Sequence, residues 1–238
     1  MSSTVETFAE TGAAVAILTA IMPKSFLPLL LLLALPALAD DWSLGVGTGP
    51  FVFGKFAERT LRASDGMGNV TLTKTKLSAA TRPGLVVDFE HGFNDRFAVR
   101  LQGTFTDAPL SVKPASGTGV SLDAGHIDVT TLTLPLVIYL NPHGRFRFHI
   151  KGGPAYAFYR IKGSPGTATP FEGTRDRFGG AAAAGVVWWW SNRFAVEGEV
   201  IDVVTASPFE RSDFVGPASI SIPKTQNGHA TVGLRWKF

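Results

Sequence analysis

The chain has 238 residues, a hydrophobic fraction of 45% and a formal net charge of only +3. No run of basic residues with interleaved aromatics occurs, so the sequence gives no sign of a nucleic-acid partner. It contains no cysteine. Disulfides are therefore excluded, and stability has to come from a large hydrogen-bonded sheet or a large core.

The N-terminal part resembles a secretory signal. After Met22 come one lysine, an apolar core at 26–35 and the small-x-small triplet Ala37-Leu38-Ala39. The apolar core is too short for a membrane-spanning helix. We therefore expect translation to start at Met22 and residues 1–39, an upstream extension plus signal peptide, to be removed. The mature domain is then 40–238; the alternative is a single N-terminal membrane anchor, which several prolines would interrupt.

Apolar residues in the mature part recur at every second position, which is the signature of strands. In RFAVRLQGTF, for example, Phe97 and Leu101 share one parity, whereas Arg100 and Gln102 share the other. No apolar run there is long enough for a helical span. The alternation predicts strands at 42–53, 84–91, 97–106, 127–140, 145–161, 178–190, 194–204 and 227–238.

The connections between these strands alternate between short and long. The short ones, at 92–96, 141–144 and 191–193, carry the Asn, Asp, Gly or Pro that tight turns favour. The long, polar ones fall at 55–82, 107–125, 162–177 and 205–225. This layout predicts an all-β, eight-stranded antiparallel up-and-down transmembrane β-barrel in a bacterial outer membrane, with both termini periplasmic. The segment NVTLTKTKL also alternates, so a strand extension inside the first long connection stays open.

Charged residues lie at one depth of the predicted barrel, near the short turns. An eight-stranded barrel has an interior just wide enough to be filled by side chains, and buried charges need partners. Four acids and four permanent bases therefore predict an internal ion-pair network. Its members are Asp88, Glu90, Arg100, Gln102, Arg147, His149, Lys151, Glu197, Glu199 and Arg235. The alternative is a water-soluble barrel that carries these charges on its surface.

The strand at 127–140 leaves its orientation undecided. The parity of Asp128 and Thr130 would point Leu132 and Leu134 into the barrel. Either a bulge near Thr130 or Pro135 reverses the parity, or part of the lumen is apolar.

Aromatic residues favour a membrane, because amphipathic rings gather at its two interfaces. We expect one belt near the short turns and a second toward the far end of strand 145–161. The first comprises Trp42, Tyr139, Trp188, Trp190, Trp236 and Phe238, and the second Tyr156, Phe158 and Tyr159. The run GGAAAAG at 179–185 is interpreted as a low-bulk stretch that faces large neighbours.

The order of these segments resembles the OmpW family of small outer-membrane barrels. The resemblance is carried by VTTLTLPLVIYLNPHGRFRFHIKGGPAYAFY (129–159), by FGGAAAAGVVWWWSNRFAVEGEVIDV (178–203) and by FTDAPLSVK (105–113). It implies passage of small hydrophobic molecules through an apolar upper lumen with sideways exit into the bilayer. Leu132 and Leu134 would then be solute contacts if that register holds. The terminal Trp236 and Phe238 resemble the signal that the barrel-assembly machinery selects, and outer-membrane lipid is the other expected partner.

Two other functions stay open. The barrel could be a structural or adhesin-like protein that acts through its external loops. It could also be a lipid hydrolase with a Ser-His-acid arrangement on its outer face. The five histidines are His91, His126, His143, His149 and His229, and none is in a recognisable Ser/His pair on a lipid-facing parity. We expect no enzyme, cofactor or metal site.

Overall fold

The computed structural model describes residues 41–64, 70–114, 121–163, 172–214 and 219–238. The expected extension and signal peptide lie outside the described residues. The chain divides into two units, and the barrel is the unit Ser43–Lys237. No helix in the described ranges is long and apolar enough to cross a membrane.

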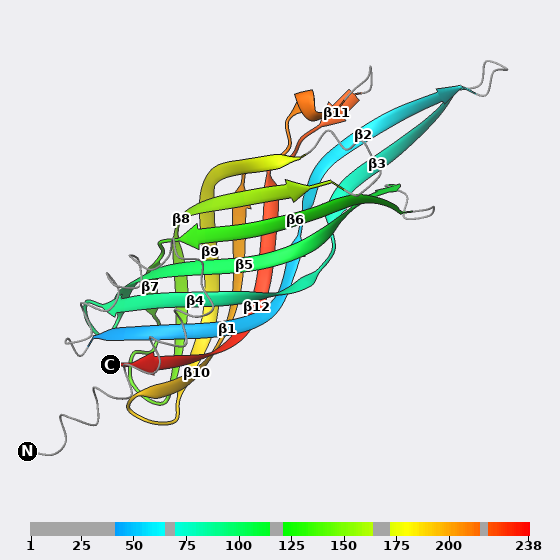
Figure 1. Ribbon diagram of the computed structural model, residues 1–238. Coiled ribbons are helices and arrows are strands. Elements are labelled where there is room, and N and C mark those ends of the chain that lie inside the picture. The colour runs from blue at the N-terminus through cyan, green and yellow to red at the C-terminus, as the bar shows by residue number, and fades with distance from the viewer. Residues whose placement is uncertain (1–40, 65–69, 115–120, 164–171, 215–218) are drawn as a thin grey trace, which may run out of the picture. The chain divides into compact units, whose positions relative to one another are not determined.

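An antiparallel sheet that closes on itself makes up this unit (Figure 1). The ring runs in the order β1, β12, β10, β9, β8, β6 with β7, β5 and β4, and returns to β1. This is the predicted eight-stranded barrel. The wall strands are β1 (Trp42–Phe53), β4 (Arg82–Gly92), β5 (Phe97–Pro114), β6 (Leu122–Thr133), β7 (Leu136–Tyr139), β8 (Phe146–Lys162), β9 (Gly173–Trp189), β10 (Phe194–Thr205) and β12 (Thr225–Lys237).

The predicted strand 127–140 is β6 followed by β7, interrupted at Leu134 and Pro135. Proline has no N–H for the ladder, and β5 nonetheless stays bonded there, because Arg100 N–H donates to the Pro135 carbonyl (3.1 Å). The parity is the same on both sides of the break: Thr131, Thr133 and Val137 are all buried in the interior. The break therefore reverses nothing.

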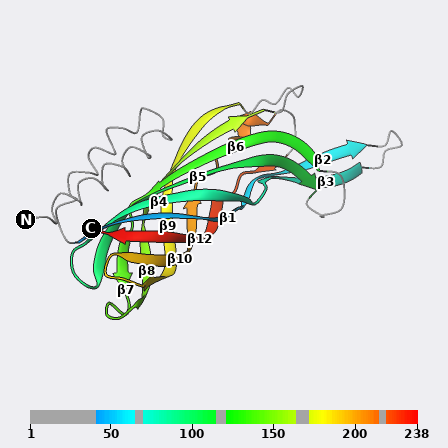
Figure 2. The ribbon, with the colours of Figure 1, turned by 60° about the horizontal axis from the view of Figure 1, so that its bottom comes forward.

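The first long connection is largely a hairpin, so the extension left open by the sequence is present. It consists of β2 (Lys55–Ser64) and β3 (Val70–Ala79), which pair antiparallel. β3 also pairs with the far end of β5, and the short β11 (Ser219–Ser221) pairs with β2. Figure 2 shows the hairpin projecting beyond the other strands of the barrel. The last long connection contains a further short element, the 3-10 helix η2 (Arg211–Asp213).

The barrel is apolar on its outside and polar inside at the end that carries the short turns, called here the short-turn end. Large outward side chains such as Phe97, Phe148 and Leu234 are 40%, 53% and 61% exposed. Inward Arg100 and Arg235 are each 1% exposed. An exterior with this much exposed apolar surface suits lipid and not water.

Candidate functional site: the filled barrel interior

Side chains fill the barrel interior in two layers. A charged layer lies toward the short-turn end, and an apolar layer lies toward the long connections. In the charged layer the predicted network residues, with one exception, lie together. Its two centres are Arg100 on β5 and Arg235 on β12.

Arg100 joins residues from opposite walls of the barrel. Its Nε donates to Glu90 Oε2 on β4 at 2.7 Å. Its Nη1 donates across the lumen to Glu197 Oε1 at 2.7 Å and to Glu199 Oε2 at 3.2 Å, both on β10. A guanidinium presents several donors in a fixed fork, so one side chain can satisfy several carboxylates. Arg100 thereby connects β4, β5 and β10 through the lumen.

Arg235 forms the second centre, nearer the short turns. Its Nη2 donates to Asp88 Oδ1 at 2.6 Å and its Nε donates to Glu197 Oε2 at 2.8 Å. Its Nη1 donates to the Ser43 hydroxyl on β1 at 2.8 Å. Glu197 thus accepts from both arginines and links the two centres.

Lys151 and His149 on β8 close the network on the remaining side. Lys151 Nζ lies 2.7 Å from Glu199 Oε2 and donates to Gln102 Oε1 at 2.6 Å. His149 Nε2 lies 3.2 Å from Glu199 Oε2 and 3.4 Å from Glu197 Oε1. The network therefore spans the lumen from β4 and β5 to β8, β10 and β12.

Sequence reasoning was wrong about Arg147 and Tyr139. Arg147 has the lumen parity, but its guanidinium lies over the Trp189 ring, 5.7 Å from the centroid, and no ion pair is found for it among the described residues. Tyr139 was placed in an aromatic belt, yet it is buried and donates its hydroxyl proton to Glu90 Oε1 at 2.6 Å. Ser43 was missed. The only sequence signal for Tyr139 and Ser43 is the alternation of their strands, which places both side chains inside the barrel. Alternation does not reveal which buried groups lie within hydrogen-bonding distance of each other.

Small residues of β9 make room for the network. A Cβ on Gly185 would lie 2.6 Å from His149 Cε1 and 2.7 Å from the Gly198 carbonyl oxygen. On β1, a Cβ on Gly45 would overlap the Asp88 carboxylate. At Gly185 one of the two close atoms is a backbone oxygen, which cannot move aside, so this position requires glycine. The interpretation of GGAAAAG as a low-bulk stretch facing large neighbours therefore holds at Gly185.

His149, Glu197 and Glu199 also place three potential metal ligands within 4.8 Å of one another. However, both carboxylates already accept hydrogen bonds from Arg100, and Lys151 lies against Glu199. A metal ion would have to displace these cations. The cluster is better explained as part of the ion-pair network.

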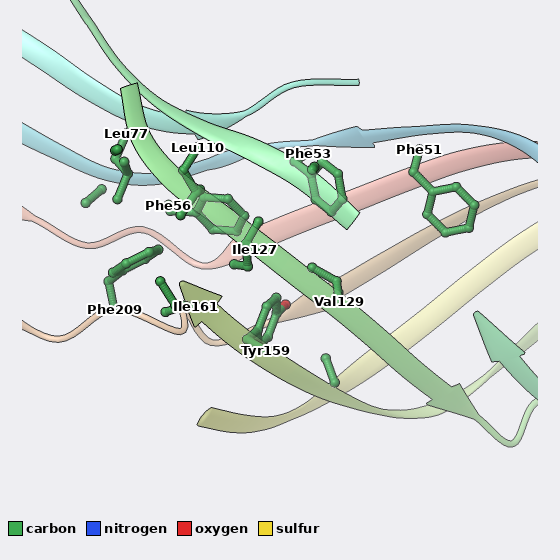
Figure 3. Packing of buried hydrophobic residues seen from close by; sticks show 14 of the residues in the cluster. Phe51, Phe53, Phe56, Leu77, Leu110, Ile127, Val129, Tyr159, Ile161 and Phe209 are labelled. Carbon is green, nitrogen blue, oxygen red and sulfur yellow. The ribbon is translucent and has the colours of Figure 1, made fainter. Parts of the chain in front are cut away.

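The apolar layer fills the other half of the interior (Figure 3). Phe56 and Tyr159 meet edge to face with ring centroids 6.5 Å apart, and Phe51 stacks on His229 at 4.3 Å. Tyr159, expected in the second belt, therefore lies in the lumen, where its hydroxyl accepts from Asn227 Nδ2 at 2.9 Å. This half is called the apolar compartment. Its lumen residues include Phe51, Phe53, Phe56, Val86, Leu110, Ile127, Val129, Tyr159, Ile161 and Phe209.

Leu132 and Leu134 are not part of the apolar compartment. Leu134 is 51% exposed on the outside, and Leu132 shares its parity, whereas Thr131 and Thr133 point inward and are buried. The register on which their role as solute contacts depended is not adopted. Asp128 had suggested the opposite parity, but it lies on the outer surface and pairs with Lys162 at 2.7 Å.

A row of aromatic rings lies on the outside at the short-turn end. Phe146 stacks on Trp188 at 6.0 Å, Trp190 stacks on Phe194 at 6.2 Å, and Phe194 stacks on Trp236 at 6.3 Å. The row crosses β8, β9, β10 and β12, and suits a membrane interface. At the other end Tyr156 and Phe158 face outward on β8, and their ring centroids lie 4.8 Å apart. Phe238 follows the last residue of β12.

The filled interior predicts the electrical behaviour of the barrel. The cavity beside Arg100 and Glu197 measures about 20 Å³, roughly the space that one water molecule needs. The reconstituted monomer is therefore expected to show no large, weakly selective conductance in planar bilayers. A stable conductance of the kind that wide aqueous porins give would contradict a filled lumen.

Comparison with known proteins places this fold among the outer-membrane β-barrels. The outer membrane protein OprG from Pseudomonas aeruginosa matches with a TM-score of 0.55 and 16% identity, over 84% of this chain and 97% of that chain. The outer membrane protein AlkL matches with a TM-score of 0.46 and 12% identity, over 84% and 90%. Ail, the attachment invasion locus protein of Yersinia pestis, matches with a TM-score of 0.40 and 13% identity, over 84% and 100%.

These similarities concern the fold alone. No family model matches the chain, and no curated protein matches its sequence. The chain is thus a small eight-stranded barrel of the outer-membrane type, similar in fold to the expected OmpW-like barrels.

Proposed function

We propose that this barrel takes small hydrophobic molecules from the external medium into its apolar compartment and releases them sideways into the outer membrane. The observation that carries the proposal is the division of the lumen. Apolar side chains line the half toward the long connections, and the Arg100–Arg235 network closes the half toward the short turns. A solute that enters the apolar half has no aqueous route onward, so the wall is its only exit.

A recess in the wall supports the sideways route. It measures about 470 Å³ and is formed by β1, β4, β5 and β6. Lipid-facing Leu85, Phe105 and Thr130 line it together with lumen-facing Thr106 and Val129. Residues of both faces therefore meet at one place in the wall.

The main-chain ladder is incomplete at this recess. Pairing of β4 with β5 ends at Leu85 and Phe105, and the next backbone hydrogen bond runs from Ala80 N–H to the Pro109 carbonyl at 3.0 Å. Between them Thr106 Oγ1 donates to the Pro83 carbonyl at a long 3.4 Å. A wall with fewer ladder bonds opens at a lower free-energy cost than a fully paired one.

Narrowing the recess tests the route. Thr130→Trp places a bulky side chain at its lipid-facing rim and is expected to reduce uptake of radiolabelled naphthalene by cells severalfold. Leu136→Trp is the matched control, because Leu136 also faces outward, is 46% exposed and does not line the recess. Equal uptake by both variants, or parental uptake no greater than that of cells lacking the protein, would refute the route.

A second candidate function is binding through the projecting hairpin. Outward-facing Lys74 and Lys76 of β3 adjoin Lys113 of β5, and Lys76 is directly opposite Lys113 in the ladder. Glu58, which is opposite Lys76 on β2, has a pKa lowered by its hydrogen bond with Lys55 and by the charges of Lys74 and Lys76. This cationic face suits an anionic surface partner.

Replacing Lys74, Lys76 and Lys113 with glutamate separates the two functions, because these residues form the cationic face and none of them lines the apolar compartment. If surface binding is lost and naphthalene uptake is unchanged, the barrel has both functions. If binding is lost and no uptake is seen even in the parent protein, surface binding is its function and uptake is not.

The partners we propose are outer-membrane lipid around the apolar band and the assembly machinery, which would recognise Trp236 and Phe238. The periplasmic position of both termini and the lack of an enzymatic role stay predictions.

A further inference from the structure

We propose that the segment Ala206–Asp213, which follows β10, is a releasable lid over the apolar compartment, and that Phe209 fills the space an entering solute takes. This segment is called the lid. The inference rests on the proposed function, because it concerns how the same compartment is opened.

Phe209 behaves as a plug although it belongs to a connection between strands. It is only 2% exposed, and its ring centroid lies 5.7 Å from that of Phe56 and 6.3 Å from that of Phe214. Figure 3 shows it at the edge of the apolar cluster, near Ile161. A connection usually runs over the surface, so a fully buried phenyl ring from a connection means that the lid closes on the compartment.

Two arginines of the barrel wall hold the lid in place. Arg175 Nη2 donates to Asp213 Oδ1 at 2.6 Å, and Arg177 Nη2 donates to Glu210 Oε1 at 2.9 Å. Arg177 Nε also donates to the Ser207 carbonyl at 2.8 Å. Both arginines are on the inward parity of β9, so one strand holds both ends of the lid.

The lid also has internal structure that does not depend on the wall. Glu210 N–H donates to Asp213 Oδ2 at 2.7 Å, and Asp213 N–H donates to the Glu210 carbonyl at 3.1 Å. These bonds close the single turn of η2. Its shape is therefore kept when the contacts to Arg175 and Arg177 break, and the lid can move as one piece.

Exposure distinguishes these ion pairs from those at the other end of the lumen. In the pairs of Glu210 both partners are partly exposed, since the Glu210 side chain is 58% exposed and those of Arg175 and Arg177 are 27% and 22% exposed; in the Arg175–Asp213 pair only the arginine is, because Asp213 is 8% exposed. Partly exposed pairs are weak and are screened by salt, whereas the pairs around Arg100 are shielded from both effects. The barrel thus has one end that opens readily and one that does not.

Thiol reactivity measures lid opening without any solute. The chain has no cysteine, so Ser207→Cys introduces a single thiol at a buried lid position. Because the Ser207 hydroxyl donates to the Phe56 carbonyl at 2.9 Å, every rate is compared with that of the Ser207→Cys protein. In liposomes, combining it with R175Q and R177Q is expected to raise the rate of labelling by a water-soluble maleimide about tenfold. High salt should raise the rate with the arginines intact. Phe209→Ala, which removes the apolar anchor, should also raise it.

Two controls accompany the measurement. Ser212→Cys is exposed, so its labelling rate should not respond to the arginine substitutions. Arg160→Gln removes an outward arginine of β8 and should leave labelling at position 207 unchanged. All variants must keep the mobility shift between unheated and boiled samples, which reports an intact barrel.

Naphthalene uptake separates this inference from the proposed function. Faster labelling at position 207 together with faster uptake in the R175Q/R177Q variant upholds both. Faster labelling without uptake in any variant upholds lid motion and refutes the proposed route. Labelling at the parental rate in the arginine variant, in Phe209→Ala and at high salt overturns the lid, even if the parent protein takes up naphthalene.

Discussion

Replacing Arg100 with leucine is expected to destabilise the barrel by about 3–5 kcal/mol, because it leaves buried carboxylates without their cation. Arg100 contacts Glu90, Glu197 and Glu199 and is 1% exposed. The cavity beside them measures about 20 Å³, too little for the several water molecules that three carboxylates need. The urea midpoint of the protein refolded into lipid vesicles, followed by the mobility of unheated samples on a denaturing gel, measures the loss.

Arg147→Leu is the matched control for this substitution. Arg147 has the same lumen parity, but its guanidinium lies over Trp189, and removing it leaves no carboxylate unpaired. The expected loss is about 0.5–1 kcal/mol, the value of a cation–π contact at an exposed site. If Arg100→Leu proved no more damaging than Arg147→Leu, the network would not stabilise the barrel in the way its geometry implies.

Gly185→Val is expected to cost about 1–3 kcal/mol through overpacking. Even the first carbon of the new side chain would lie 2.6 Å from the His149 ring and 2.7 Å from a backbone oxygen of β10. The ring cannot easily turn away, because its Nε2 lies against Glu197 and Glu199. The same urea titration in vesicles measures the effect.

Gly152→Val on the neighbouring strand β8 provides the comparison. A Cβ there meets only the Ala181 carbonyl oxygen at 3.6 Å, which is ordinary contact distance, and the residue faces outward. This variant should retain close to the parental midpoint. Similar losses at both glycines would mean that valine disturbs these strands by itself and that the close approach at His149 is irrelevant.

The strands, the ring and the inward orientation of most charges follow from local alternation, because a strand reverses its side chains at each residue. Phe97 and Phe148 face outward and Arg100 and Lys151 face inward, as their parities predicted. The parity argument failed at 127–140, because the two faces of this strand differ little in polarity. Asp128 was a misleading marker, since a charge beyond the apolar band can face outward and pair with Lys162.

Period-two patterning is a property of neighbouring residues, so local sequence is enough to specify a barrel with a charged layer at one end. Which charges meet was decided only by the tertiary structure. Strand register brings Tyr139 to Glu90, leaves Arg147 at Trp189, and sets Gly185 against His149. It also brings Phe209 from a polar connection into the lumen. These contacts join residues far apart in the chain, and no local pattern encodes how the strands are staggered around the ring.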